Sequence, residues 1–473
     1  MQISKTDFIQ FLNCPKSLWL LKHRPDEYPH DEFSDYAQKI AAEGYEVEDQ
    51  VQAYLTAQDD AKRYEFQSEF HTERELYAKA DVIRHNDDES FNIYEVKSST
   101  QVKTDAAHNQ LKDAVFQKIT AEEAGCRVAK VFIVHLNPDY VRQGNPDPSQ
   151  LLAFEDVSER VAAIEDETRA EIDDAVDLLN QGSIDETSCS CLGLTRSNHC
   201  DAFNHFNPDI PDPSIYSLPR VTKKRLSGFV ADGRFGLDQI GEEEVTAGQL
   251  PVLRAAQKGT PIIDKAVLQA FFARAKYPLY FLDYETYSSA IPLVDGAKPQ
   301  APIPFQYSLH VKKTPDDADP EHFEFLAPTA SLPLAMIEHM ERIIGAVGSV
   351  VSWHSSFENT QNRTMAEWYP EKAKFLNNLV DRTLDLEDLF KAGYVDIAFG
   401  GSTSIKKVLP IIVPDLSYDD MEVANGTDAM EAWSQLLDLP DGPEKDKLRQ
   451  DMLEYCKLDT LAMVRIFDEI AKL

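Results

Sequence analysis

The chain has little of what marks secreted, membrane or disulfide-bonded proteins. Six cysteines in 473 residues exclude a dense disulfide scaffold and favour a reducing compartment. No uninterrupted apolar stretch approaches the length of a membrane span, and no basic segment followed by an apolar one opens the sequence. Long low-complexity runs and internal repeats are also absent. We therefore expect a cytoplasmic protein with no membrane partner.

Basic residues are also scarce. The chain carries 47 Lys and Arg against 81 Asp and Glu, a net charge of −34. This balance disfavours tight binding of bulk duplex, because phosphate contacts supply most non-specific affinity for nucleic acids. The basic residues that are present cluster locally at positions 220–225, 312–313 and 406–407. Any nucleic-acid partner is therefore expected to offer single strands or ends.

The most informative stretch is a predicted hairpin in the first quarter of the chain. Residues 80–83 and 91–97 have the composition of strands, and the polar residues 86–90 form the turn between them. Glu95 and Lys97 share one face because side chains alternate along a strand, and Asp81 lies on the neighbouring strand. Paired carboxylates can hold a divalent cation, and the lysine can position water or steady a phosphoryl oxygen. The pattern predicts phosphodiester cleavage, although the same triplet also occurs on ordinary solvated hairpins.

A helix carrying Gln117 follows this hairpin, and another helix that includes residues 41–48 precedes it. Here the sequence resembles the RecB-like branch of the PD-(D/E)XK nucleases, whose three motif positions are matched by Asp81, Glu95 and Lys97. In that resemblance Gln117 is the helical glutamine, and the first-helix acid is Glu43 or Glu48. The resemblance covers about residues 1–205. It implies a restriction-endonuclease-like mixed sheet with flanking helices.

Four cysteines stand apart from the expected core positions, and they are Cys14, Cys189, Cys191 and Cys200. Four thiolates suit an iron–sulfur cluster or tetrahedral zinc, and plain free thiols are the alternative. One early and three late cysteines resemble the iron–sulfur nucleases of the CRISPR-adaptation and recombination-repair types. That resemblance implies a 4Fe–4S cluster that links the first helix to the end of the domain. The Cys-x-Cys spacing departs from the family pattern, so one of Cys189 and Cys191 is a candidate bystander, and His199 could substitute for it if zinc were bound.

The remaining two cysteines and the middle of the chain carry no visible chemistry. Cys126 and Cys456 stand in apolar helical contexts and are interpreted as core residues. Residues 201–220 are rich in proline and predict an extended connector. Residues 221–275 predict a small helical bridge that ends in a helix over 264–276.

Acidic motifs return in the second half of the chain. A buried-type strand over 278–286 ends in Asp283 and Glu285, which alternation places on one face. A second strand, over 350–354, leads into a helix that carries Glu358. A helix over 453–460 places Tyr455 and Asp459 one turn apart on the same face.

This succession resembles the tyrosine subclass of DEDD exonucleases, which have a ribonuclease H-like α/β fold. The resemblance implies that Asp283, Glu285, Glu358 and Asp459 hold two Mg²⁺ or Mn²⁺ ions and that Tyr455 orients the attacking water. Glu358 stands where the family carries aspartate, and Asp385 is the alternative ligand. Between the motifs, residues 400–410 combine glycines, hydroxyls and two lysines, which suit phosphate contacts or equally a flexible loop with a helix N-cap.

The whole chain resembles a bacterial family built on the domain of unknown function 2779. We expect a RecB-like domain over 1–205, a linker and helical bridge over 206–275, and a ribonuclease H-like domain over 276–473. The expected activity is metal-dependent hydrolysis of DNA, with RNA as the alternative substrate, in repair or defence against foreign DNA. One rival hypothesis makes one centre inactive and retains it for strand binding. The other is a non-catalytic protein whose acidic surface docks a partner.

Overall fold

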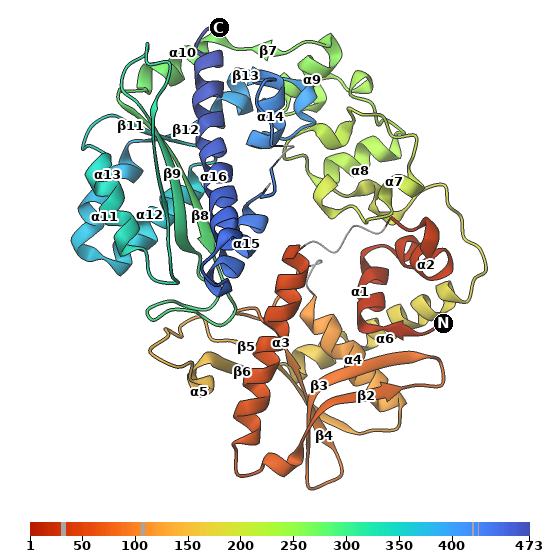
Figure 1. Cartoon of the computed structure of the whole chain (residues 1–473). Helices are drawn as coiled ribbons and strands as arrows, with labels where there is room; N and C mark the ends of the chain where they lie inside the picture. Colours follow the sequence, from red (N-terminus) through yellow and green to blue (C-terminus); the bar gives the residue numbers. More distant parts are fainter. Residues whose placement is uncertain (30–34, 106–108, 419–420, 424) are drawn as a thin grey trace. The chain divides into compact units, whose positions relative to one another are not determined.

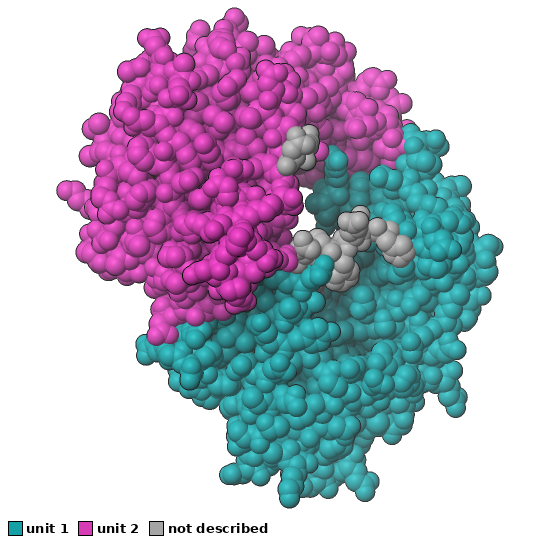
Figure 2. All heavy atoms as spheres, in the orientation of Figure 1, with its two compact units in different colours: residues 1–209, 289–292, 297–301 teal, residues 210–288, 293–296, 302–473 magenta. Residues whose placement is uncertain are grey.

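In the computed structural model the chain is described over residues 1–29, 35–105, 109–418, 421–423 and 425–473. It forms two compact units, coloured separately in Figure 2. Unit 1 comprises Met1–Asp209, Ser289–Pro292 and Ala297–Ala301. Unit 2 comprises Ile210–Ser288, Leu293–Gly296 and Pro302–Leu473.

Unit 1 contains a mixed sheet in the order β1-β3-β4-β5-β6, with β2 also paired to β3. Strands β2, β3 and β4 are antiparallel neighbours, whereas β5 runs parallel to β4. All six residues of β4 are buried, so the side chains of this central strand, Glu95 included, lie inside the domain. The strands are β1 (Ile3–Ser4), β2 (Tyr64–His71), β3 (Leu76–His85), β4 (Phe91–Val96), β5 (Val128–Leu136) and β6 (Leu152–Asp156).

Helices cover both faces of this sheet, as Figure 1 shows. Phe8 of α1, Phe116 of α4 and Val161 of α6 share one apolar core with Ile133 of β5. Residues of α3 pack in a second core with β3, β4 and β5. The unit contains α1 (Lys5–Asn13), α2 (Pro15–His23), α3 (Asp35–Thr56), α4 (Gln110–Glu123), α5 (Pro148–Leu151), α6 (Ser158–Leu179) and α7 (Phe203–Phe206), with short 3₁₀ turns at Pro25–Glu27, Ala61–Arg63, Ser190–Gly193 and Arg196–Asn198.

Unit 2 contains a five-stranded sheet in the order β10-β9-β8-β11-β12. Strands β8, β9 and β10 form an antiparallel meander, and β11 and β12 are parallel to β8. This order puts β8, the strand of the Asp-x-Glu motif, at the centre. The strands are β8 (Leu279–Tyr287), β9 (Ile303–Lys312), β10 (Glu321–Leu326), β11 (Ser349–Ser352) and β12 (Thr383–Asp385), beside a small antiparallel pair of β7 (Ile262–Ile263) and β13 (Tyr394–Val395).

Two apolar cores flank this sheet. Helices α10, α14 and α16 pack with Phe281 in one core, and α11, α12 and α13 pack with Leu282 in the other. In Figure 1 the long helix α16 runs along β8 and β9. The helices are α8 (Lys223–Ala231), α9 (Leu250–Lys258), α10 (Lys265–Arg274), α11 (Leu334–Ile343), α12 (Ser356–Trp368), α13 (Ala373–Asp381), α14 (Ile405–Ile412), α15 (Gly426–Asp438) and α16 (Pro443–Ile470), with a π-turn at Leu389–Gly393 and 3₁₀ turns at Ile215–Ser217, Leu237–Gln239, Glu242–Glu244, Pro370–Lys372 and Ile397–Phe399.

The predicted mixed α/β class is confirmed, and three local expectations are wrong. Residues 201–220 are not simply extended, because they contain α7 and the Ile215–Ser217 turn. Cys126 lies after α4 in the loop before β5, and it packs against an apolar cluster from there. The strand expected over 350–354 ends at Ser352, because His354 has φ 57° and turns the chain into α12. No helix among the described residues combines the length and apolarity that a bilayer crossing requires.

Candidate functional site

The first acidic centre lies in unit 1, where β3, β4 and α4 bring together the four predicted residues. Glu95 is buried at 1% exposure, and its Oε1 accepts a hydrogen bond from Lys97 Nζ at 2.8 Å. Its Oε2 accepts one from Gln117 Nε2. Asp81 Oδ2 accepts the backbone N–H of Val96 at 2.7 Å, which fixes it beside Glu95.

Two residues that no motif had assigned complete this centre. Lys5, the first residue of α1, places its Nζ 2.5 Å from Glu95 Oε1. Asp113 of α4 binds Lys97 Nζ at 2.8 Å, so Lys97 is held between two carboxylates. A lysine at the positive end of a helix is electrostatically unfavourable, and that was the one sequence signal for Lys5.

The charges of this centre are coupled. Burial opposes ionisation of Glu95, but the ammonium groups of Lys5 and Lys97 outweigh it and hold the pKa of Glu95 below its usual range. Burial and the nearby charge of Glu95 raise the pKa of Asp81 well above its ordinary value, although Lys5 opposes this. Unionised acids beside ionised ones are the arrangement that a divalent cation relieves.

The two candidate first-helix acids differ in their surroundings. Burial and the charge of Glu95 raise the pKa of Glu48, and Glu48 acts in turn on Asp81. Glu43 is instead paired with Lys39 and accepts a hydrogen bond from Gln300 at 3.3 Å. Glu48 is therefore the helix acid that shares the electrostatic field of Asp81 and Glu95.

The second acidic centre lies in unit 2 and draws its acids from three elements. Asp283 and Glu285 come from β8, Glu358 from the first turn of α12 and Asp459 from the middle of α16. All are buried except Asp283, which is half-buried. Ligand atoms of Asp283, Glu285 and Cys456 lie within 4.8 Å of one another. Cys456 is thus buried as expected, yet its thiol also reaches Asp283 Oδ2 at 3.8 Å.

Each acid of this centre has a raised pKa. Burial raises the pKa of Glu285 to about 8, with a further contribution from Asp459. Burial raises the pKa of Glu358 to about 8 as well, and that of Asp459 to about 6. Desolvation of its carboxyl group and the nearby charges of the other three acids raise the pKa of Asp283 well above its ordinary value. Glu358 Oε2 is buried and has no hydrogen-bond partner among the described residues.

Two tyrosines and one lysine surround these acids. Tyr418 donates its hydroxyl to Asp459 Oδ1 at 2.6 Å, and Tyr455 lies near enough to Asp459 to lower the pKa of that acid. Lys406 lies over both rings, 5.5 Å from the centroid of Tyr418 and 5.6 Å from that of Tyr455. No sequence spacing pointed to Tyr418. Lys406 belongs to the predicted glycine–serine–lysine stretch and reaches the acidic centre from α14.

Asp385, the alternative ligand, has a different role in the structure. Its carboxylate accepts the backbone N–H groups of His354, Ser355 and Glu387 at 3.0 to 3.1 Å. It therefore caps the turn that leads from β11 into α12. Glu358 lies with the other acids, while Asp385 holds the backbone that presents Glu358.

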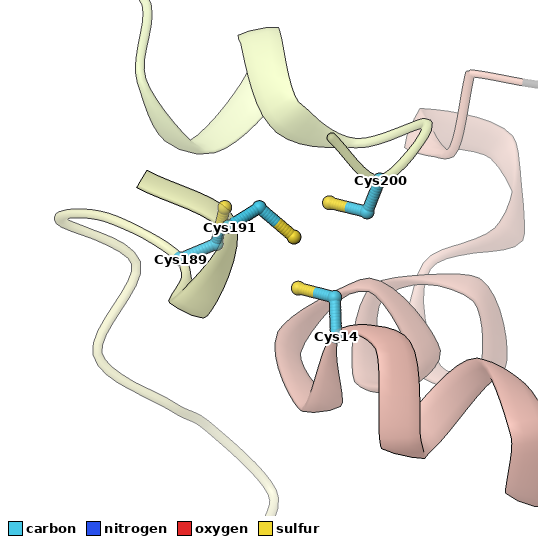
Figure 3. A group of neighbouring side chains, drawn as sticks. All are labelled: Cys14, Cys189, Cys191 and Cys200. Carbon is cyan, nitrogen blue, oxygen red and sulfur yellow. The ribbon is translucent and has the colours of Figure 1, made fainter. Parts of the chain in front are cut away.

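The four predicted cysteines meet in unit 1, and Figure 3 shows their side chains gathered at one point. Their sulfur atoms all lie within 4.8 Å of one another. Cys14 follows α1, while Cys189 and Cys191 flank the first residue of a 3₁₀ turn. Both members of the Cys-x-Cys pair therefore reach the same point, and neither is a bystander in position. His199 is instead stacked on Phe203 and hydrogen-bonds the Leu194 carbonyl.

The basic residues at 312–313 and the 400–410 stretch make different contacts in the structure. Lys312 is buried and paired with Asp468 at 3.1 Å, which makes it part of the core. Lys313 pairs with Glu321 on the surface. In the 400–410 stretch, Thr403 donates its hydroxyl to Glu387 at 2.5 Å, and its carbonyl accepts the indole N–H of Trp353. That stretch is therefore tied to the turns around β11 and β12.

Part of the chain is similar to known proteins. A family model described as a domain of unknown function (DUF2779) matches residues 280–404, which include Asp283, Glu285 and Glu358. The uncharacterized protein MG366 of Mycoplasma genitalium is 30% identical over 216 residues, covering 40% of this chain and 31% of that protein. Its homologue from Mycoplasma pneumoniae, also uncharacterized, is 26% identical over 232 residues, covering 44% and 34%.

The chain therefore spans about a third of the length of these curated relatives. Among solved structures, one titled "Crystal structure of SSO0001" is 15% identical and covers 42% of this chain and 87% of that chain. Its TM-score is 0.25.

Proposed function

We propose that the protein is a divalent-metal-dependent nuclease with one hydrolytic centre in each unit. The observation that carries the proposal is the convergence of Asp283, Glu285, Glu358 and Asp459 in unit 2. Their raised pKa values mean that the fold gathers carboxylates without enough positive charge to ionise them. Hard divalent cations prefer such oxygen donors, and the unpartnered Glu358 Oε2 offers one more.

The topologies support the two expected nuclease folds. A ribonuclease H-like sheet is expected to have a central strand with an antiparallel meander on one side and two parallel strands on the other, and the order β10-β9-β8-β11-β12 supports that proposal for unit 2. In unit 1, a helix, three antiparallel strands, a helix and a parallel strand succeed one another as α3, β2, β3, β4, α4 and β5. That succession is the one expected of a restriction-endonuclease-like core. Site chemistry, not fold alone, is what favours hydrolysis.

In unit 2 the four acids would hold two Mg²⁺ or Mn²⁺ ions. When bound, such ions supply an activated water and stabilise the oxygen that leaves the phosphorus. Tyr455 would orient the water through its hydroxyl, which already lies against Asp459. Lys406 lies over the tyrosine rings and would offset charge on the phosphate.

In unit 1 Asp81 and Glu95 would hold the cation, and Glu48 is the helix acid whose charge acts on Asp81. Gln117 orients Glu95 through its Nε2, and its Oε1 is buried without a partner among the described residues. Lys97 is held by Glu95 and Asp113, and it would position water or steady a phosphoryl oxygen. DNA with single strands or free ends is the proposed substrate, because the net charge of −34 disfavours broad duplex contacts.

The test uses the full chain with end-labelled single- and double-stranded DNA and RNA, in Mn²⁺ or in chelator. We expect cleavage only with the metal, retained in part by Asp81→Ala and by Asp283→Ala, and abolished in the double variant. Asp139→Ala and Asp381→Ala remove exposed carboxylates of the two units and serve as matched controls. Cleavage that survives in the double variant would contradict the proposal.

Two outcomes would favour the rival functions. If one single variant abolishes all cleavage and the other changes only strand affinity, one centre is a binding site. If no substrate is cut with any divalent ion, and chelator leaves partner binding unchanged, a non-catalytic acidic protein is favoured.

We also propose that the four cysteines bind a metal centre that joins α1 to the end of unit 1. Four sulfur atoms within 4.8 Å suit a single tetrahedral ion such as Zn²⁺, for which bonds of about 2.3 Å bring thiolates close together. A 4Fe–4S cluster has its irons inside the thiolate set, so it would require the sulfurs to move apart. Metal analysis and the visible spectrum of anaerobically purified protein separate the two. Cys200→Ser should lower the content of either metal, and Cys126→Ser, the matched control, should not.

A further inference from the structure

A cavity of about 610 Å³ lies in unit 2, and the chemistry proposed above does not use it. The segment before the sheet lines one side with Arg220, Gly248 and Val252. The turns after β11 and β12 line the other side with His354 and Glu387. Its volume is within the range of about 300–1,000 Å³ typical of sites for small molecules and cofactors.

The cavity and the acidic centre share one turn of chain. His354 lines the cavity, and Glu358, four residues later, belongs to the acidic centre. Asp385 accepts the His354 N–H at 3.0 Å and fixes this turn, and its charge also acts on Glu358. One turn of chain therefore links the wall of the cavity to an acid of the centre.

The formal charges at the cavity wall are balanced, with Arg220 and Lys391 beside Glu387 and Asp396, whereas the chain as a whole is strongly acidic. Of the two acids, Glu387 is already engaged by Thr403, His354 and Lys391, and Asp396 accepts the backbone N–H of Ala398. The Arg220 side chain makes no hydrogen bond or ion pair with any described residue, although the chain carries 81 acidic residues. An unpaired guanidinium at a cavity wall favours an anionic ligand, above all a phosphate.

Basic residues continue from Arg220 along the surface. Lys223 and Lys224 begin α8, are exposed, and form no ion pair with the described part of the chain. Ammonium groups at the positive end of a helix are unfavourable for the helix itself. Lys223 and Lys224 therefore extend the positive charge of Arg220 along the surface, where they could bind a second phosphate of the same strand.

The backbone at the cavity is strained. Arg220 has φ 49° and His354 has φ 57°, in the left-handed region that favours glycine. A non-glycine residue in that region is energetically unfavourable, and such residues concentrate at functional sites. The apolar wall includes Val252, Val395 and Phe399, which offer a surface for a flat ring.

Building on the nuclease function, we propose that this cavity holds one nucleotide of a single-stranded nucleic acid whose neighbouring phosphodiester lies at the acids of unit 2. The base packs on the apolar wall, and its phosphate binds Arg220. Lys223 and Lys224 bind the strand as it leaves the cavity. Unit 2 would thus select strands that have at least one unpaired nucleotide next to the bond that is cut.

The first test measures binding of fluorescein-labelled oligothymidylate and oligouridylate to the full chain in chelator, where no cleavage occurs. Arg220→Gly should weaken binding about tenfold, the loss expected for one charge-assisted phosphate contact. Glycine suits the left-handed backbone, so thermal stability should not fall. Arg220→Lys should recover part of the affinity, and Lys374→Ala, which removes an exposed lysine of α13, should change nothing.

The second test fills the cavity. A Cβ added at Gly248 meets no atom within 4 Å, and the residue has an ordinary φ, so we expect Gly248→Trp to fold and its indole to obstruct the cavity. Gly228→Trp adds the same indole at an equally open position of α8 that does not line the cavity. We expect weaker strand binding for Gly248→Trp alone.

The outcomes separate this inference from the nuclease function. If Arg220→Gly and Gly248→Trp bind strands as the parent does, while Asp283→Ala still loses cleavage, the cavity proposal is wrong and the function stands. If thymidine monophosphate fills the cavity but does not compete with the strand, the cavity is a free-nucleotide site and the proposal is also wrong. If the parent neither binds nor cuts any strand, both proposals fail together.

Discussion

Glu95 in unit 1 and Glu285 in unit 2 are buried carboxylates on central strands, yet their pKa values move in opposite directions. Lys5 and Lys97 lie against Glu95 and keep it ionised in spite of burial. Glu285 is buried beside Asp459 and Glu358, and its pKa rises to about 8 although Lys406 opposes the shift. Ammonium groups keep Glu95 ionised in unit 1, whereas no acid of the four in unit 2 has a lowered pKa.

This difference predicts how each centre admits a cation. A divalent ion entering unit 2 must displace protons, because all four acids have raised pKa values. An ion entering unit 1 meets Lys5, which acts on Glu95, Asp81 and Glu48 together and so lies where a cation would lie. Proton competition should dominate in unit 2 and lysine competition in unit 1.

The largest expected effect is on the pH dependence of metal use. Between pH about 6 and about 8, the half-saturating Mn²⁺ concentration of unit 2 should fall about 100-fold more than that of unit 1. Each further proton displaced contributes about tenfold per pH unit, and unit 2 displaces more of them. Cleavage by Asp81→Ala reports unit 2, and cleavage by Asp283→Ala reports unit 1. Equal slopes for the two variants would break the comparison.

A smaller effect is expected from Lys5→Met, measured in the Asp283→Ala background. Methionine keeps the length of the side chain and removes the ammonium group that competes with the cation. The half-saturating Mn²⁺ concentration of unit 1 should fall about tenfold, which corresponds to about 1.4 kcal/mol. Lys130→Met, which removes an exposed ammonium paired with Asp156, is the matched control. Loss of cleavage at saturating Mn²⁺ would instead show that Lys5 contacts the substrate.

The sequence predicted those parts of both centres that depend on the regular spacing of side chains within one strand or helix. Alternation along β8 correctly placed Asp283 and Glu285 together, and helical spacing did the same for Tyr455 and Asp459. Lys5 and Tyr418 were missed because their contacts join segments distant in sequence, where no spacing rule applies. The turn at His354 was missed because a left-handed histidine is held by Asp385, a tertiary contact.

The smallest expected effect concerns the stability of unit 2 without metal. The pKa of Glu285 rises from about 4.3 in an unfolded chain to about 8 in the folded one. The folded state therefore binds more protons than the unfolded state across that window, and stability falls as pH rises through it. Glu285→Gln removes the ionisable group, so it should stabilise the metal-free protein above pH about 8 and give no gain near pH about 4.

We expect a gain of about 1 kcal/mol, or about 2–4 °C in the unfolding midpoint. Tryptophan fluorescence reports it, because unit 2 contains Trp353, Trp368 and Trp433. Glu371→Gln removes an exposed carboxylate from the same unit and controls for the change in net charge. Added Mn²⁺ should then stabilise the parent more than Glu285→Gln, because the ion replaces the missing positive charge only where Glu285 can ionise. Destabilisation by Glu285→Gln at high pH would mean that the carboxylate is balanced within the fold, as Glu95 is in unit 1.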